Sequence, residues 1–84
     1  MLYLADTDGQ CVDDLEHGPW LDWFPLRDGL TLIDSPESRS VVYHAVKWRV
    51  PEGTALLVAE LSGDPKFKGM AGGAAGWLAE RARR

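Results

Sequence analysis

Two aspartates at the ends of expected strands are the first residues whose type and position suggest chemistry. Asp6 follows the apolar run MLYLA, and Asp34 closes the run GLTLID. One or two carboxylates, completed by water, suffice to bind Mg²⁺. The two side chains form such a site if both strands end at the same edge of a sheet. We favour the alternative, in which each Asp serves a turn or a cap, and we assign no metal ligand.

The stretch PKFKGMAGGAAGW places two lysines before a glycine-rich run. A phosphate-binding P-loop requires a Lys directly after its second glycine and then a hydroxyl residue. Here the lysines precede Gly69, and Met70 and Ala71 follow it, so that pattern is absent. A generic anion-binding site remains, made of Lys66, Lys68 and Gly69 at the start of a helix expected near Gly69 or Met70.

The small residues of the same stretch also have a packing interpretation, which we prefer. Gly69, Gly72, Gly73 and Gly76 interleave with alanines at spacings of three and four residues. A small helix face allows another element to approach closely. Each interior glycine costs about 1 kcal/mol relative to alanine, so close contact must compensate. The pattern predicts packing against the chain's own sheet or against a second subunit.

The remaining reactive side chains form no complete catalytic pattern. Cys11 is the one cysteine, so neither an intrachain disulfide nor a cysteine zinc cluster can form. The two histidines, His17 and His44, belong to no nucleophile arrangement that linear spacing can reveal. We therefore assign no catalytic residue and no cofactor.

Composition favours a contact surface over a reaction centre. The 84 residues suffice for one small domain, 1–84. Four tryptophans are many for this length, and so small a core is not expected to enclose them all. At least one should therefore lie at an edge or in an interface. The expected contact residues are Trp48, Phe67, Met70 and Trp77.

Charge is unevenly distributed along the chain. The net charge is −4, with most acids in residues 1–46 and most bases in 47–84. Such segregation favours head-to-tail association or one basic patch. Nucleic-acid binding is disfavoured because the chain as a whole is acidic, with a pI of about 4.9.

The sequence predicts neither a targeting signal nor a membrane span. The N-terminal residues MLYLADTDGQ lack the basic and long apolar regions of a signal peptide. No apolar run approaches the ~20 residues that a spanning helix requires. The sequence predicts a cytoplasmic protein with no membrane partner.

Several segments predict the elements that must position these residues. Apolar alternation and turn residues indicate strands over 1–5, 20–24, 30–34 and 54–61, and helices over 36–50 and from about 69 onward. The strand at 20–24 should be an edge, because Pro25 closes it. The unbroken apolar run TALLVAEL should be a central strand covered on both faces.

The middle of the chain predicts the topology. Ser35 suits the cap and Pro36 the first turn of the helix. Together, 30–34, 36–50 and 54–61 make a βαβ unit, which implies parallel strands joined by a right-handed crossover. We expect an α/β (α+β) fold, a small two-layer sandwich with two helices on a mixed sheet of three or four strands.

Three segments of the chain resemble segments of other proteins. At YHAVK (43–47), PEGTALLVAEL (51–61) and PKFKGM (65–70) the chain resembles short actinobacterial proteins of unknown function, of the kind found in Streptomyces. This resemblance implies a bacterial, cytoplasmic origin and brings no activity. A more distant likeness is to ferredoxin-like domains of the Cas2 type. It implies that Asp6 lies at a dimer interface and serves metal-dependent nuclease chemistry, although the segment after the first strand predicts no helix.

The sequence therefore predicts a non-enzymatic protein-interaction module or small assembly subunit, either a homodimer or the partner of another protein. The alternative is a metal-dependent phosphodiesterase or a nucleotide- or anion-binding protein. It would use Asp6 and Asp34 for metal and Lys66 and Lys68 for phosphate.

Overall fold

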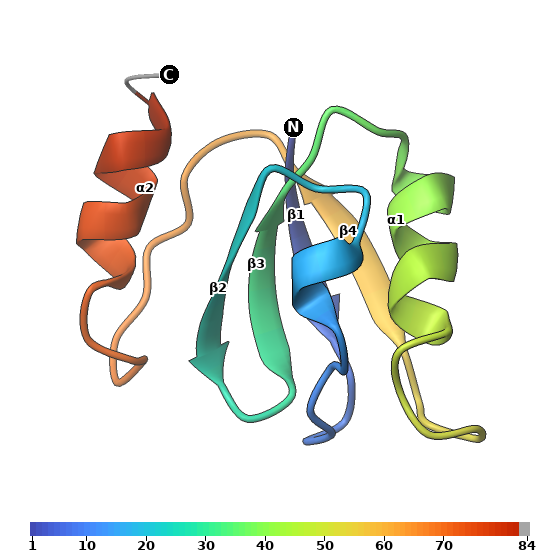
Figure 1. The fold of residues 1–84 in the computed structure, drawn as a ribbon. Helices are drawn as coiled ribbons and strands as arrows, with labels where there is room; N and C mark the ends of the chain where they lie inside the picture. Colours follow the sequence, from blue (N-terminus) through green and yellow to red (C-terminus); the bar gives the residue numbers. More distant parts are fainter. Residues whose placement is uncertain (83–84) are drawn as a thin grey trace.

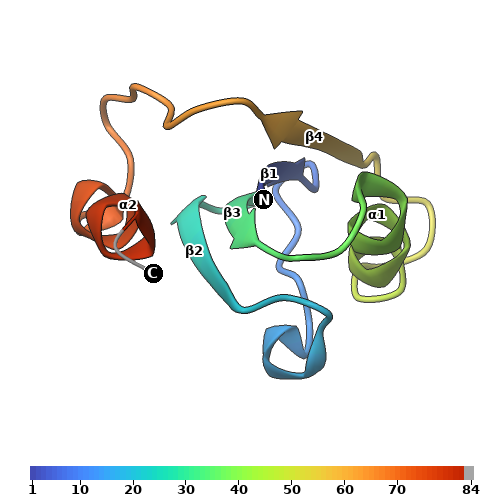
Figure 2. The same cartoon turned by 90° about the horizontal axis from the view of Figure 1, so that it is seen from above.

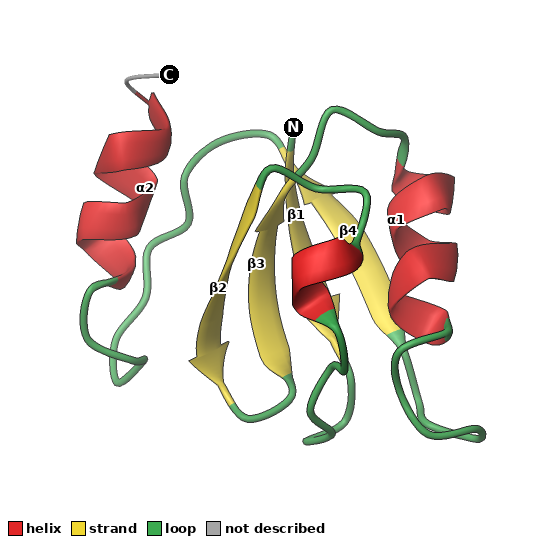
Figure 3. Ribbon diagram, viewed as in Figure 1, coloured by secondary structure: helices red, strands yellow, loops and turns green. Residues whose placement is uncertain are grey.

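A four-stranded sheet forms the centre of the molecule, with helices packed on it (Figures 1 and 3). The computed structural model describes residues 1–82. In chain order the elements are β1 (Leu2–Asp6), the 3₁₀ turn η1 (Leu15–His17), β2 (Asp22–Arg27), β3 (Leu30–Asp34), α1 (Arg39–Lys47), β4 (Leu57–Leu61) and α2 (Ala74–Ala82). The expected α+β class, with four strands and two helices, is confirmed. Within the described residues, neither helix is long and apolar enough to cross a membrane.

The strand order is β2-β3-β1-β4, and every neighbouring pair is antiparallel. Because β3 and β4 both run antiparallel to β1, they point in the same direction, as the predicted βαβ unit requires. They are not neighbours, however, since β1 lies between them. The sheet is therefore antiparallel throughout rather than mixed.

The connections explain how the chain covers both faces of this sheet. Residues 7–21 join β1 to β2, and α1 joins β3 to β4, each passing over a strand that lies between the two it links. Both connections lie on one face, and α2 lies on the other (Figure 2). The order and directions of the four strands are those of a split βαβ arrangement. In this chain the loop of residues 7–21, with its one 3₁₀ turn, takes the place of the first helix of that arrangement. The helices thus flank the sheet instead of forming one layer.

Side chains of β1 alternate between two hydrophobic clusters, as strand geometry dictates. Leu2 and Leu4 join the cluster on the α2 face, whose buried members are Leu2, Leu26, Leu32, Ala74 and Leu78. Tyr3 and Ala5 join the cluster on the α1 face, whose buried members are Tyr3, Ala5, Ile33, Val42 and Val46. Leu32 and Ile33 of β3 divide between the same two clusters, so β1 and β3 are the two interior strands, each covered on both faces.

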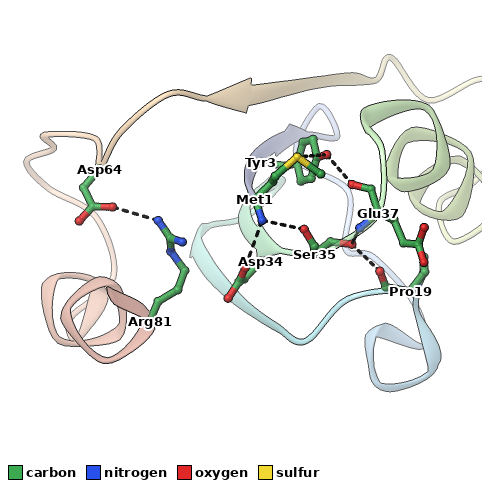
Figure 4. A network of polar contacts seen from close by, with 8 residues as sticks. All are labelled: Met1, Tyr3, Pro19, Asp34, Ser35, Glu37, Asp64 and Arg81. Carbon is green, nitrogen blue, oxygen red and sulfur yellow. Dashed lines mark hydrogen bonds and ion pairs between the residues drawn. The ribbon is translucent and has the colours of Figure 1, made fainter. Parts of the chain in front are cut away.

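The start of α1 differs from the prediction by three residues. Ser38, in extended backbone, is the N-cap, and its hydroxyl accepts a hydrogen bond from the Val41 N–H at 3.3 Å. Ser35 is instead fully buried (Figure 4). Its Oγ donates to the carbonyl of Pro19 at 2.6 Å and accepts from the N–H of Glu37 at 3.1 Å. Ser35 therefore joins β3 to two loops rather than capping a helix.

The two edge strands are β2 and β4. The expected edge at 20–24 is confirmed, although β2 runs on to Arg27, and its register shifts between Pro25 and Arg27. The expected central strand is wrong, because 54–61 contributes β4, which is shorter and pairs with β1 alone. An apolar run shows that a strand is partly buried but does not show how many neighbours it has.

Candidate interaction surface

The two candidate metal ligands do not meet. In the antiparallel pairing of β1 with β3, Asp6 is opposite Leu30, whereas Asp34 is opposite Leu2. The two residues therefore lie at opposite ends of the sheet, and the shared metal site, which we considered as the less favoured alternative, is not formed because β1 and β3 are antiparallel. Among the described residues, no group of three or more potential metal-ligating side chains gathers in one place.

Asp6 has the turn role that our favoured interpretation expects, whereas Asp34 contacts the N-terminus of the chain instead of a turn or a cap. The Asp6 carboxylate accepts a hydrogen bond from the Asp8 N–H at 2.9 Å, which shapes the turn after β1. Asp34 is largely buried, with its Oδ1 at 3.8 Å from the N-terminal ammonium of Met1 (Figure 4). Asp6 and Asp8 line a small hollow of about 190 Å³ beside Leu56 and Leu57, but Asp34 does not belong to it.

The candidate anion site also differs from the expectation. Lys66 and Lys68 are exposed in the loop between β4 and α2. The helix begins at Ala74 rather than near Gly69, because Gly69 and Gly73 have left-handed backbone angles, with φ of 75° and 95°. The free N–H groups of the first helical turn thus lie several residues beyond the lysines. Lys66, Lys68 and Gly69 all lie in the loop and not at the start of α2.

Most glycines of the stretch 69–76 do not pack closely against the chain's own sheet, and only Gly76 lies within α2. A methyl group added at Gly72 or Gly76 would meet no atom within 4 Å. At Gly73 the nearest atoms belong to the Phe24 ring, 3.7 Å away, which is ordinary contact. The expected close approach within the chain is therefore wrong at these positions. Contact with a second subunit stays a prediction.

Three of the four expected contact residues hold α2 in place. Phe67, Met70 and Trp77 are partly buried and pack against the cluster on the α2 face. The Trp77 indole N–H also donates to the Asp22 carboxylate at 2.9 Å. These side chains have partners within the chain. The fourth, Trp48, is 79% exposed.

Trp48 borders a shallow groove at the end of α1. The groove has a volume of about 430 Å³, and its lining includes Tyr43, Trp48, Pro51 and Leu56. A second groove, of about 380 Å³, continues from Tyr43 along α1 to Arg39 and Val58. Tyr43 lines both, so the two grooves follow the boundary between α1 and β4. We call the residues Arg39, Tyr43, Trp48, Leu56, Leu57 and Val58, with the free edge of β4, the α1–β4 surface.

The edge of β4 is the backbone component of this surface. β4 is paired with β1 on one side and ends the sheet on the other. Its register with β1 is continuous from Leu57 to Leu61, without a bulge. Leu57, on the face opposite α1, is 57% exposed. An exposed strand edge presents unpaired N–H and C=O groups that can pair with another chain.

One buried titratable side chain near this surface, Tyr3, has a structural role. The buried Tyr3 hydroxyl donates to the Glu37 carbonyl at 2.6 Å (Figure 4). Burial raises the pKa of Tyr3, and the negative charge of Glu60 on the neighbouring strand raises this pKa further. Tyr3 thus stays protonated as a fixed hydrogen-bond donor, and no proton-transfer pair is formed there.

Sequence reasoning identified Trp48 but missed Tyr43 and the edge of β4. Glu60 could have indicated that β4 is an edge strand. An interior strand that is buried on both faces rarely carries an unpaired acidic side chain. In comparisons with models of protein families, with curated proteins and with solved structures, we find no match to this chain. Functional inference therefore depends on the geometry described above.

Proposed function

We propose that this chain is a non-enzymatic protein-interaction module that binds a partner strand along the α1–β4 surface. The observation that carries the proposal is the exposed indole of Trp48 beside an unpaired strand edge. Tryptophan is enriched among the residues that dominate binding energy at protein interfaces. An extended segment added to a sheet edge gains main-chain hydrogen bonds, and adjacent grooves accept its side chains.

The enzyme alternative lacks comparable support. It required Asp6 and Asp34 to share a site and the lysines to flank a helix start, and the structure separates both sets. The α1–β4 surface instead combines aromatic, aliphatic and charged side chains, a mixture typical of contact surfaces.

Replacement of Trp48 tests the proposal. Phage-displayed random peptides would be selected on the immobilised wild-type protein, and their binding to Trp48→Ala would then be compared. Because the ring is largely exposed, this variant should keep the wild-type circular dichroism spectrum. We expect peptide affinity to fall by about 30-fold or more, the loss expected for a hot-spot residue.

Leu21→Ala is the matched control, because Leu21 is 67% exposed and lies directly before the other edge strand, β2. It should leave peptide affinity unchanged. Equal effects of the two substitutions would refute the assignment of the surface, as would failure of the wild-type protein to bind any peptide or a second copy of itself.

A further inference from the structure

The two edges of the sheet differ in their protection against pairing with another chain. The β2 edge carries Pro25, which has no N–H to donate, and a register irregularity between Pro25 and Arg27. α2 also packs against β2. Prolines, bulges and covering elements are the devices by which proteins block an edge. β4 has neither a proline nor a bulge, so its edge is available for pairing.

We propose that the partner at this edge is a second copy of the chain, whose β4 pairs antiparallel with the first to form one continuous eight-stranded sheet. This inference rests on the proposed function, since it uses the same surface, and it names the partner. The two-fold axis passes between Ala59 and Ala59 of the second copy. In this register alone, all five residues of β4 pair with the same five residues of the copy.

Each side-chain pair of this register is favourable on the face opposite α1. Leu57 is opposite Leu61 of the second copy, and Leu61 is opposite Leu57 of the second copy. Directly opposed side chains have Cβ atoms about 5 Å apart and stabilise a sheet when both are apolar. The pairing therefore covers Leu57, which is 57% exposed in the single chain.

The α1 face supplies charge complementarity. Here Val58 is opposite Glu60 of the second copy. Val58 lines a groove together with Arg39, so that carboxylate enters a groove bordered by a guanidinium. Within residues 1–82, neither Arg39 nor Glu60 forms an ion pair. The dimer gives each a partner of opposite charge, and does so twice because of the symmetry.

Other registers are worse for identifiable reasons. An axis at Glu60 sets two carboxylates directly opposite each other, which is destabilising. An axis at Val58 places Glu60 and Leu61 opposite residues outside β4. With the axis at Ala59, the segment that follows Leu61 of the second copy is directed toward the groove at Trp48, which links the edge to the rest of the α1–β4 surface.

Cysteine cross-linking tests the register directly. In a Cys11→Ser background, Ala59→Cys should form a disulfide-linked dimer on mild oxidation, because this position alone meets itself across the axis. Leu57→Cys should not cross-link by itself but should do so when mixed with Leu61→Cys. Cross-linking of Leu57→Cys with itself, and not of Ala59→Cys, would overturn the proposed register.

Charge exchange gives an independent test on a protein without new cysteines. In sedimentation equilibrium, Glu60→Arg and Arg39→Glu should each raise the dimer dissociation constant by about tenfold or more. The double variant should return it to near the wild-type value, which a purely structural effect of either residue would not do. Glu16→Arg, which changes net charge equally at an exposed site away from the edge, should leave it unchanged.

The two proposals fail in distinguishable ways. A wild-type protein that stays monomeric at all concentrations, yet binds selected peptides that Trp48→Ala does not bind, overturns the second-copy inference and supports the interaction module. A monomer that binds no peptide overturns both. A dimer whose dissociation constant is unchanged by Glu60→Arg, Arg39→Glu and Trp48→Ala overturns the second-copy inference, and the interaction module is then decided by the peptide affinity of Trp48→Ala.

Discussion

Replacement of Ser35 by alanine should strongly destabilise the fold, although it removes a single oxygen atom. Ser35 is fully buried, and its hydroxyl forms two hydrogen bonds, to the Pro19 carbonyl and from the Glu37 N–H (Figure 4). The Ser35 N–H donates in addition to the Met1 carbonyl at 2.9 Å. The hydroxyl thus connects β3 to the loop before β2 and to the loop before α1.

The size of the effect follows from these contacts. Each hydrogen bond contributes about 1 kcal/mol, and a buried group left without a partner adds to the loss. We expect Ser35→Ala to lower the free energy of unfolding by about 2 to 3 kcal/mol. A chain of this length has a total stability of roughly 4 to 13 kcal/mol. The midpoint of thermal unfolding should accordingly fall by about 10 to 20 °C.

Two nearby serines provide matched comparisons in urea titrations followed by tryptophan fluorescence. Ser38→Ala removes the N-cap of α1 and should cost about 1 kcal/mol. Ser40→Ala lies on the exposed side of α1 and should be neutral or slightly stabilising, because alanine favours helix. The reasoning is refuted if Ser35→Ala costs no more than Ser38→Ala, or if its effect equals that of Ser40→Ala.

Three further predictions concern the turns and the core. A Cβ at Gly29 would lie 2.1 Å from the backbone nitrogen of Gly9, whereas one at Gly9 would meet nothing within 4 Å. Because both glycines have positive φ, Gly9→Ala should lower the free energy of unfolding by about 1 to 2 kcal/mol. Gly29→Ala should lower it distinctly more, and equal urea midpoints for the two variants would contradict this. Burial raises the pKa of Tyr3 in the folded state above its value of about 10 in the unfolded chain. The stabilisation that protonated Tyr3 provides is therefore complete at pH values below about 10. It should be lost as pH rises above 10, so wild-type unfolding free energy should fall more steeply there than that of Tyr3→Phe. Arg49 donates to the carbonyls of Ala45 and His17 at 2.9 and 3.1 Å, and Arg49→Lys should lower the urea midpoint because a lysine has no planar fork; an unchanged midpoint would argue against this role.

The fold could be predicted in part because local patterns identify local elements. The strand predicted at 30–34 has the bounds of β3, and a strand predicted at 1–5 is present as β1 (Leu2–Asp6). Neighbour relations were not predictable in the same way. The periodicity of a strand shows which faces are buried, but the identity of the strand beside it depends on contacts between distant segments.

The candidate site, too, could be predicted only in part, because it depends on contacts between distant segments. Asp6 and Asp34 both end strands, and their separation follows from β1 lying between β3 and β4 in an antiparallel sheet. For Phe67, Met70 and Trp77, composition indicated large contact areas correctly, but it did not indicate whether the partner was the same chain. The expectation that at least one of four indoles stays outside so small a core is met by Trp48, but composition did not indicate which tryptophan it would be.

The interior position of β1 also determines when the fold can be completed. β1 is the first element of the chain, yet it pairs with β4, in which Leu61 is opposite Leu2 and Leu57 is opposite Asp6. These partners are roughly 50 to 60 residues apart, and contacts of such long range slow folding because a large loop must close first. During synthesis, one edge of β1 can pair once β3 has emerged, but the edge that faces β4 must stay unpaired until nearly three quarters of the described chain has emerged. A ribosome paused before residue 57 should hold a nascent chain in which this edge of the first strand is accessible to chaperones.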